Sequence, residues 1–299
     1  MIGSHLSYKG NAIGLQGWNS IFWLESTRVE SLRQMRGLWN LGNTCWFNTA
    51  CQALAHVPPL TKHFFDVPYE GPCDVTREYQ KVVRQLFVRG KTDPVSPSDL
   101  LGAFRARFPQ FSGRQQHDAQ EAFLILIDVF EESLGKEFIQ GLFNGEEVQK
   151  TIWDSGCSEV RSPFTTLLMD VSEPCRLQDL LDDRKEPVIL EGYTDNQGKT
   201  HASAAVERKV ARWPKFTSFS FSMYESHRFP VELPFEFKGL KLFACIMHQG
   251  HRNGGHYALL VRRYDKWYVK DDCTITEVPS IDILKGEFYM AFYRPMNSL

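Results

Sequence analysis

The sequence changes character near Phe143, from segments with a helical repeat to segments typical of strands. Before this point, apolar side chains recur at helical spacing, which predicts helices at residues 43–54, from Ser98 onward and at residues 118–134. After it, runs rich in β-branched and aromatic residues predict strands at residues 164–171, 216–223, 242–247, 257–261 and 267–269. Because helices and strands are segregated along the chain, we expect an α+β fold.

Composition narrows the classes of protein to which this chain can belong. Its 299 residues are 42% hydrophobic, enough for one large core or two modest ones. Lys and Arg total 34 against 36 Asp and Glu, so the net charge of −2 gives no overall attraction to nucleic acid or to an anionic membrane. No apolar run is long enough to cross a bilayer, and the start of the chain does not resemble a secretory signal. We therefore expect a soluble intracellular protein.

The cysteines and two irregular segments complete this outline. Seven scattered cysteines in a chain of this size indicate free thiols in a reducing compartment, the cytosol or the nucleus. Residues 1–36 are interpreted as an N-terminal extension, whose aromatic cluster at residues 18–24 favours packing on the body. The polar residues 182–202 are interpreted as a loop or insertion. The sequence does not indicate an oligomeric state.

Cys45 is the first candidate for chemistry, because it lies at the start of a helical pattern. With Asn43 or Thr44 as the helix cap, its thiol lies in the first turn. There the positive end of the helix dipole should lower the thiol pKa below its usual value of about 8.5, as a nucleophile requires. Asn40, on a glycine-flanked loop, can donate a hydrogen bond to an oxyanion. The alternative is a buried, unreactive cysteine, a common state of an isolated cysteine.

His256 is the second candidate and follows Gly254 and Gly255 at the start of a predicted strand. Paired glycines let the backbone pass close to a substrate main chain or to a neighbouring loop. An imidazole beside such a channel can take a proton from a thiol and give it to a leaving amine. Two more histidines nearby, His248 and His251, leave a metal site as an alternative, although no cysteine or carboxylate pair with ligand spacing accompanies them.

Asp271 and Asp272 follow the next predicted strand, about one hairpin after His256. If residues 257–261 and 267–269 pair as antiparallel strands, the end of the second returns beside the start of the first. An aspartate at that place can orient His256. A solvated strand end is the alternative for this acidic pair.

These segments, in this order, resemble the ubiquitin-specific proteases, the papain-like class of deubiquitinating enzymes. Residues 37–54 resemble the cysteine box of the family, with Trp46 where tyrosine is commoner and Thr49 where serine is commoner. The glutamine and acidic box and the histidine box are matched by residues 115–123 and 248–257. The resemblance extends to Pro295 through a segment similar to the last strand of the family.

The resemblance implies a catalytic domain over residues 37–299, shaped like a right hand with an α-rich thumb, a β palm and β fingers that hold ubiquitin. It also implies a set of roles. These are Cys45 as nucleophile, His256 as general base and acid, Asp271 as the orienting residue, Asn40 as oxyanion donor and Asp272 as a substitute or helper.

Recognition of a modifier is implied by the same resemblance. In this family, the residues equivalent to Asp118 and Gln120 face the extended C-terminal tail of ubiquitin, where arginines need acidic and hydrogen-bonding partners. The substrate-binding residues that we expect are Asp118, Gln120, Gln116, Gly254, Gly255 and Tyr257. The alternative is a helix N-cap at Asp118, with Gln120 and Glu121 on a solvated face.

Many members of the family stabilise their fingers with zinc on two CxxC pairs. Here residues 151–157 contain one cysteine and residues 192–198 contain none. A tetrahedral structural zinc needs four N or S ligands, so we expect zinc-free fingers, and neither a metal nor another cofactor in the enzyme.

The sequence as a whole predicts a thiol-dependent hydrolase that releases ubiquitin or a ubiquitin-like modifier through a Cys45 thioester. Two alternatives stay open: a catalytically silent ubiquitin-binding scaffold, and a papain-like protease or transferase that acts on unrelated peptides. A scaffold would keep its activity without Cys45. A general peptidase would have no reason to carry the segment at residues 115–123.

Overall fold

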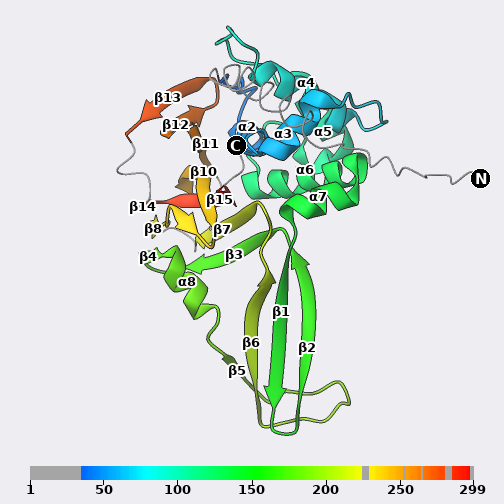
Figure 1. Ribbon diagram of the computed structural model, residues 1–299, viewed down its shortest axis with the longest axis vertical. Coiled ribbons are helices and arrows are strands. Elements are labelled where there is room, and N and C mark those ends of the chain that lie inside the picture. Colours follow the sequence, from blue (N-terminus) through cyan, green and yellow to red (C-terminus); the bar gives the residue numbers. More distant parts are fainter. Residues whose placement is uncertain (1–34, 224–228, 252–253, 264, 280–284, 297–299) are drawn as a thin grey trace, which may run out of the picture.

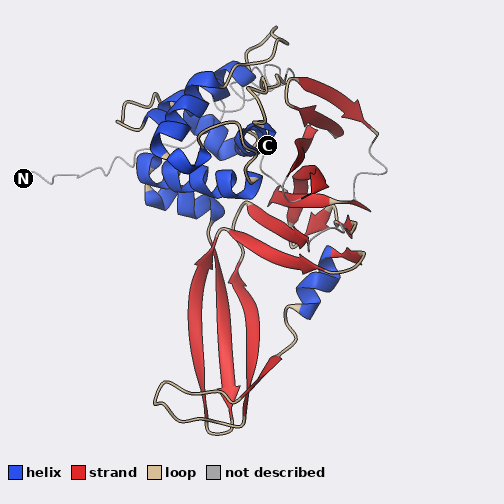
Figure 2. Ribbon diagram, turned by 180° about the vertical axis from the view of Figure 1, so that it is seen from behind, coloured by secondary structure: helices blue, strands red, loops and turns tan. Residues whose placement is uncertain are grey.

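The computed structural model describes residues 35–223, 229–251, 254–263, 265–279 and 285–296. Three regions are apparent in Figure 1: a group of helices, a central sheet beside it, and a long sheet that projects away from both. Figure 2 shows the same separation of helix from strand from behind. We call these regions the thumb, the palm and the fingers. The α+β fold expected from the sequence is confirmed.

The thumb contains α2 (Cys45–Leu54), α3 (Pro58–Asp66), α4 (Asp74–Leu86), α5 (Ser98–Arg107), α6 (Ala119–Leu134) and α7 (Lys136–Phe143), with a 3-10 turn at Pro109–Phe111. Every residue of α2 is buried, because this helix lies between α6 and strand β11 of the palm. Gly135, with a φ of 106°, ends α6, as the sequence predicts. No helix in the described ranges combines the length and apolar content that a membrane span needs.

The palm is a mixed sheet in the order β13-β12-β11-β10-β15-β7-β3, with β9 paired to β10. Its strands are β3 (Thr166–Val171), β7 (Thr217–Met223), β9 (Glu236–Phe237), β10 (Leu240–His251), β11 (Gly254–Arg263), β12 (Lys266–Asp271), β13 (Thr274–Val278) and β15 (Phe288–Pro295). Alternate residues face opposite cores: Ile246 and Leu259 pack with the thumb, whereas Cys245 and Leu260 pack in a second core. The thumb therefore covers one face of the palm.

The fingers consist of β1 (Gly145–Trp153), β2 (Gly156–Phe164), β5 (Val188–Glu191) and β6 (Ser203–Arg212), in the order β2-β1-β6-β5. A small sheet of β4 (Cys175–Arg176), β8 (Val231–Glu232) and β14 (Lys285–Gly286) lies with α8 (Leu177–Asp183) beside the palm (Figure 1). The interpretation of residues 182–202 as a loop is partly wrong, because β5 forms there and pairs with β6. The aromatic cluster at residues 18–24, which we expect to pack on the rest of the protein, lies outside the described residues.

A buried histidine ties the two loops at the tip of the fingers together. The side chain of His201 is 1% exposed, with Nδ1 2.7 Å from Asp154 Oδ1 and Nε2 2.9 Å from Asp195 Oδ2. Both ring nitrogens can donate only when the imidazole is protonated. The bond to Asp195, and then the bond to Asp154, raises the pKa of His201 above its ordinary value of 6.5.

Stability of the fingertip should therefore depend on pH. A group whose pKa is raised by folding stabilises the fold fully below its unfolded pKa, and this contribution is lost as pH rises through the folded pKa. We expect the His201→Gln variant to lose more thermal stability relative to wild type near pH 6 than near pH 9. Melting curves of both proteins test this, and a difference in Tm that does not change with pH would contradict it.

The absence of zinc from the fingers stays a prediction. Residues 151–157 form the end of β1, a turn and the start of β2, and residues 192–198 lie in the loop that approaches His201. Elemental analysis of the purified protein is expected to find no stoichiometric zinc. More than one zinc ion per chain would contradict the prediction outright, and a single ion would require ligands other than two CxxC pairs.

Candidate active site

Cys45 is the first residue of α2, and the loop before it turns the chain into the helix. Gly42 and Asn43 have φ values of 100° and 55°, a left-handed turn that glycine and asparagine tolerate best. Thr44 is the residue at the N-cap, and its hydroxyl accepts a bond from Leu41 N at 2.9 Å. Cys45 is 1% exposed, so its thiol lies in a nearly closed position between thumb and palm.

The pKa of Cys45 differs from the expectation based on sequence. Burial raises it above the ordinary value of a cysteine thiol, and the charge of Asp272 adds to this rise, whereas backbone hydrogen bonds, including one from Tyr257, lower it. The prediction that the pKa of Cys45 is lowered is therefore wrong. Desolvation of the buried thiol outweighs the effect of the helix dipole. A nearby base is then needed to remove the proton.

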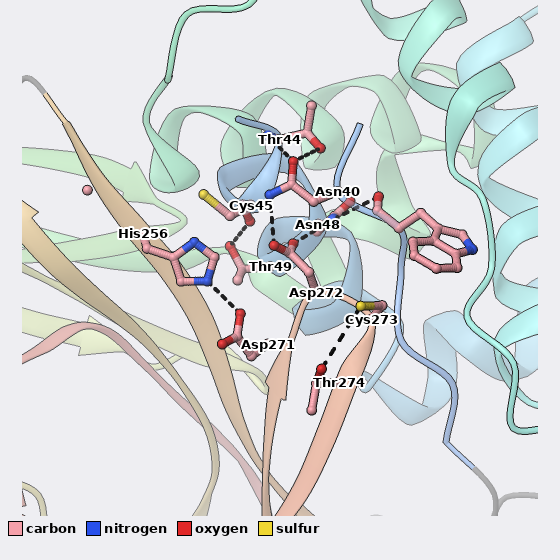
Figure 3. A network of polar contacts seen from close by, with 12 residues as sticks. Asn40, Thr44, Cys45, Asn48, Thr49, His256, Asp271, Asp272, Cys273 and Thr274 are labelled. Atoms are coloured by element: carbon pink, nitrogen blue, oxygen red, sulfur yellow. Dashed lines mark hydrogen bonds and ion pairs between the residues drawn. The ribbon is translucent and has the colours of Figure 1, made fainter. Parts of the chain in front are cut away.

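His256 and Asp271 come together because β11 and β12 pair as the predicted antiparallel hairpin, with Leu259 opposite Lys270. His256 Nε2 lies 2.5 Å from Asp271 Oδ1. The other ring nitrogen, Nδ1, lies on the side of Cys45 in Figure 3. With the Nε2 proton directed to Asp271, Nδ1 is left as the base that faces the thiol. This geometry agrees with the orienting role expected for Asp271.

Asp272 has different partners, all in the segment that carries the cysteine (Figure 3). Its Oδ2 accepts from Asn40 Nδ2 at 2.8 Å, and its Oδ1 accepts from Asn48 Nδ2 at 2.7 Å. Asn40 thus keeps one Nδ2 hydrogen for an oxyanion, and its exposed side chain leaves that hydrogen accessible. The sequence reasoning missed Asn48, although its position one helical turn after Cys45 is a signal for it.

Asp118 caps α6, as the alternative interpretation predicts. Its Oδ1 accepts from the backbone nitrogens of Gln120 at 2.7 Å and Glu121 at 3.0 Å, and its Oδ2 accepts from the hydroxyl of Tyr289. The solvated position proposed for Gln120 in that alternative is wrong, because Gln120 Oε1 accepts from Ser220 Oγ at 2.5 Å. Both side chains therefore connect the thumb to the palm.

Gln116 holds the strand that carries His256. Its amide oxygen accepts from Gly255 N at 2.6 Å, and its amide nitrogen donates to Gly255 O. A Cβ at position 255 would lie 2.3 Å from His248 Nε2, so the neighbouring strand requires glycine here. Of the two explanations for the paired glycines, close approach to a neighbouring segment applies to Gly255. A direct role of Gln116 toward substrate stays a prediction.

A cleft of about 600 Å³ runs between thumb and palm beside these residues. It is lined by Asn43, Arg114, Gln115, Gln116, His117, Asp118, His248, Gly254 and Tyr257. Four of the expected substrate-binding residues thus share one cleft, whereas Gln120 and Gly255 do not line it. The sequence reasoning missed Arg114 and His117 as lining residues, although both flank the glutamines that it singled out.

Comparisons with known proteins agree with this arrangement. The family model described as "Ubiquitin carboxyl-terminal hydrolase" matches residues 36–293. The chain belongs to the ubiquitin carboxyl-terminal hydrolase family. This match includes the nucleophile candidate, the cleft and the His256 hairpin, and it ends near the last strand of the palm.

Similar members of the ubiquitin carboxyl-terminal hydrolase family come from animals and plants. The chain is 25% identical over 301 residues to ubiquitin carboxyl-terminal hydrolase 17-like protein B of Mus musculus, covering 88% of this chain and 64% of that protein. It is 25% identical over 302 residues to ubiquitin carboxyl-terminal hydrolase 16 of Arabidopsis thaliana, covering 86% of this chain and 30% of that protein. The chain thus spans less than two thirds of the length of these relatives.

A solved structure shows the same fold. The structure titled SAGA Ubp8/Sgf11/Sus1/Sgf73 DUB module bound to ubiquitin aldehyde superposes with a TM-score of 0.75 at 19% identity, covering 92% of this chain and 74% of that chain. The hand-like architecture expected from the resemblance is therefore confirmed for this member of the ubiquitin carboxyl-terminal hydrolase family.

The departures from the cysteine box of the family are accommodated in the core. The ring of Trp46 stacks on Phe111 at 5.4 Å, and Thr49 Oγ1 donates to the carbonyl of Cys45 at 3.0 Å. The alternative of a metal site at the histidine segment stays open. The possible ligand atoms of His256, Asp271 and Asp272 lie within 4.8 Å of one another, and hydrogen bonds engage His256 Nε2, Asp271 Oδ1 and both carboxylate oxygens of Asp272.

Proposed function

We propose that this chain is a cysteine-type hydrolase that cleaves ubiquitin, or a ubiquitin-like modifier, from isopeptide-linked proteins or chains. The observation that carries the proposal is the position of His256, between the thiol of Cys45 and the carboxylate of Asp271, at the side of a polar cleft. Membership of the family supports the reaction class. The ubiquitin aldehyde in the structurally similar Ubp8 module supports ubiquitin as the modifier.

The arrangement supplies each part of an acyl transfer. His256 takes the proton of Cys45, and the resulting thiolate attacks the carbonyl carbon of the terminal glycine of the modifier. Asn40 and nearby backbone amides stabilise the oxyanion of the tetrahedral intermediate. As the C–N bond breaks, the imidazolium returns its proton to the departing amine, leaving a thioester on Cys45. Water activated by His256 then releases the modifier as a carboxylate and restores the thiol.

The cleft supports recognition of an extended tail that carries arginines. Asp118 lines it, and Gln116 and Tyr257 add polar groups along its sides. An arginine of the tail can form an ion pair with the carboxylate of Asp118, an attraction that an uncharged peptide lacks. Recognition of this kind favours a modifier tail over a general peptide.

The test is hydrolysis of fluorogenic amides formed on the C-terminus of ubiquitin and of several ubiquitin-like modifiers, alongside short peptides with the same last residues. Release of fluorophore from one full-length modifier, far above the rate for peptides, is the expected result. Binding of ubiquitin without hydrolysis would favour the scaffold instead, and equal rates on unrelated peptides would favour a general peptidase.

For its location, we propose the cytosol or the nucleus. All seven cysteines lie in the described part of the chain and none of them is in a disulfide. Exposed thiols such as Cys157 and Cys273 persist in this state in a reducing compartment.

A further inference from the structure

Lys270 is a buried lysine beside the active site, and the mechanism above does not use it. It is 2% exposed, and within the described ranges its hydrogen-bond partner is the equally buried Gln52, whose Oε1 lies 2.6 Å from Nζ. Gln52 lies in α2, two helical turns after Cys45. Lys270 directly precedes Asp271 at the end of β12. The bond therefore joins the helix of the nucleophile to the strand of the orienting carboxylate.

The alternation of β12 directs Lys270 toward the thumb. Trp267 and Val269 pack in the second core, whereas Tyr268 packs against the core shared with the thumb. Lys270 follows on the same face as Tyr268, where α2 lies. One residue beyond Asp271, Asp272 binds Asn48 of the same helix. Asp271 is thus flanked on both sides by residues that are bonded to α2.

Gln52 is oriented by its own contacts. Its Nε2 donates to Arg36 O at 3.0 Å, and its backbone carbonyl accepts from His56 Nδ1 at 2.6 Å. With the amide nitrogen turned to Arg36, the amide oxygen is left to face Lys270. The lysine therefore meets an acceptor that is oriented by the bond of the same amide group to Arg36 O.

Stability does not explain a lysine at this place. Among the described residues, the titratable groups that interact electrostatically with it are Arg263 and His56, and neither is acidic. Burial, and then the charge of Arg263, lowers the pKa of Lys270 well below its ordinary value. An apolar side chain of similar length would fill the same space without the cost of removing an amine from water. The presence of a lysine at position 270 is explained if its amine aligns β12 with α2.

We propose that Lys270 is a positioning residue: its bond to Gln52 fixes the end of β12 against α2, so that Asp271 holds His256 in line with Cys45. This inference rests on the proposed hydrolase function. Asp271 would keep its hydrogen bond to His256 without Lys270, but the pair would move relative to the thiol. Small misplacements of reacting groups of this kind reduce the chemical step more than binding.

The test compares Lys270→Met, Gln52→Met and the double variant with wild type, in hydrolysis of the modifier substrate and in thermal melting. Each single variant is expected to lower kcat about 10- to 100-fold with little change in KM. The double variant should lose no more than the worse single variant, because both changes remove the same bond. Its Tm should be higher than that of Gln52→Met, since Met at position 270 no longer leaves a buried amine unpaired, whereas the bond from Gln52 to Arg36 O is lost in both variants.

Tyr79→Phe is the matched control. It removes another buried hydrogen bond to α2, from the Tyr79 hydroxyl to Cys51 O at 3.0 Å, without touching β12. This variant is expected to lower Tm slightly and to keep the wild-type kcat. If the Lys270 and Gln52 variants also keep the wild-type kcat, or if the two losses multiply in the double variant, the positioning role is overturned. Should one single variant fail to fold, the other tests the same bond.

Alkylation of Cys45 by iodoacetamide separates this inference from the proposed function. Its rate against pH reports transfer of the thiol proton to His256 and needs no modifier substrate. In Lys270→Met, the rise in rate should move to higher pH, whereas Tyr79→Phe should follow wild type. If wild type cleaves no modifier but this shift is found, the proposed function fails and the positioning role stands. An unchanged profile overturns the positioning role.

Discussion

Replacing Cys45 by alanine is expected to abolish hydrolysis of modifier conjugates, with a loss of about 10⁴-fold or more in kcat. Cys45 is the nucleophile that the described residues place beside His256 (Figure 3), so without it the oxyanion donors alone would leave only a residual rate. Binding should survive, because the buried thiol does not line the cleft and alanine fits the space that it occupies. Steady-state kinetics and calorimetry on the same preparation measure both quantities.

Cys157→Ala is the control for this variant. Cys157 is an exposed cysteine of β2 in the fingers, far along the sequence from the site. Its replacement should leave kcat at the wild-type value, because Cys157 does not belong to the group of residues around His256. If Cys45→Ala keeps more than about 1% of the wild-type kcat, Cys45 is not the nucleophile and the assignment of the site is wrong.

Replacing His256 by glutamine is expected to lower kcat about 10²- to 10⁴-fold near neutral pH, because the variant loses both the base for the thiol and the acid for the leaving amine. The remaining activity should rise with pH. Burial raises the pKa of Cys45 above 9.0, so without the imidazole the thiolate becomes common only in more alkaline solution. Alkylation of Cys45 should then increase about tenfold per pH unit up to that pKa.

His63→Gln is the matched histidine control. His63 lies on α3 and does not line the cleft. Its replacement should leave the pH profile of wild type unchanged. A His256→Gln variant whose alkylation follows the wild-type profile would show that another group removes the proton from Cys45.

The sequence indicates which residues make up the candidate site, but not how deeply they are buried or which partners they bond. Local patterns singled out Cys45, His256 and Asp271 as candidates, and the order of the three segments, through the resemblance to a family, assigned their roles. The pKa of Cys45 could not be predicted, since its direction depends on burial by segments distant in the sequence. The same limit applied to the roles of the paired aspartates. Only the structure shows that Asp271 bonds His256 and that Asp272 bonds Asn40.

Some helices and strands of the fold could likewise be predicted from the sequence, and others could not. The sequence predicts strands at residues 257–261 and 267–269, which lie within β11 and β12, and it predicts the capped helix α6. The amphipathic helix α4 was not assigned, although its buried residues Val75, Tyr79, Val82 and Leu86 recur at helical spacing. Strand β5 was missed because it is short, fully exposed and surrounded by polar sequence, so that only its pairing with β6 defines it. The secondary structure of a short exposed segment such as β5 therefore depends on the strand with which it pairs.

The most direct test of the central claim is covalent labelling with ubiquitin whose C-terminus carries a thiol-reactive electrophile, followed by mass spectrometry of the modified peptide. Other modifiers with the same electrophile serve as parallel reagents. The expected result is one adduct per chain, located on Cys45 and absent from the Cys45→Ala variant. An adduct on another cysteine, or no adduct although ubiquitin binds, would contradict the assignment of this site as a deubiquitinating centre.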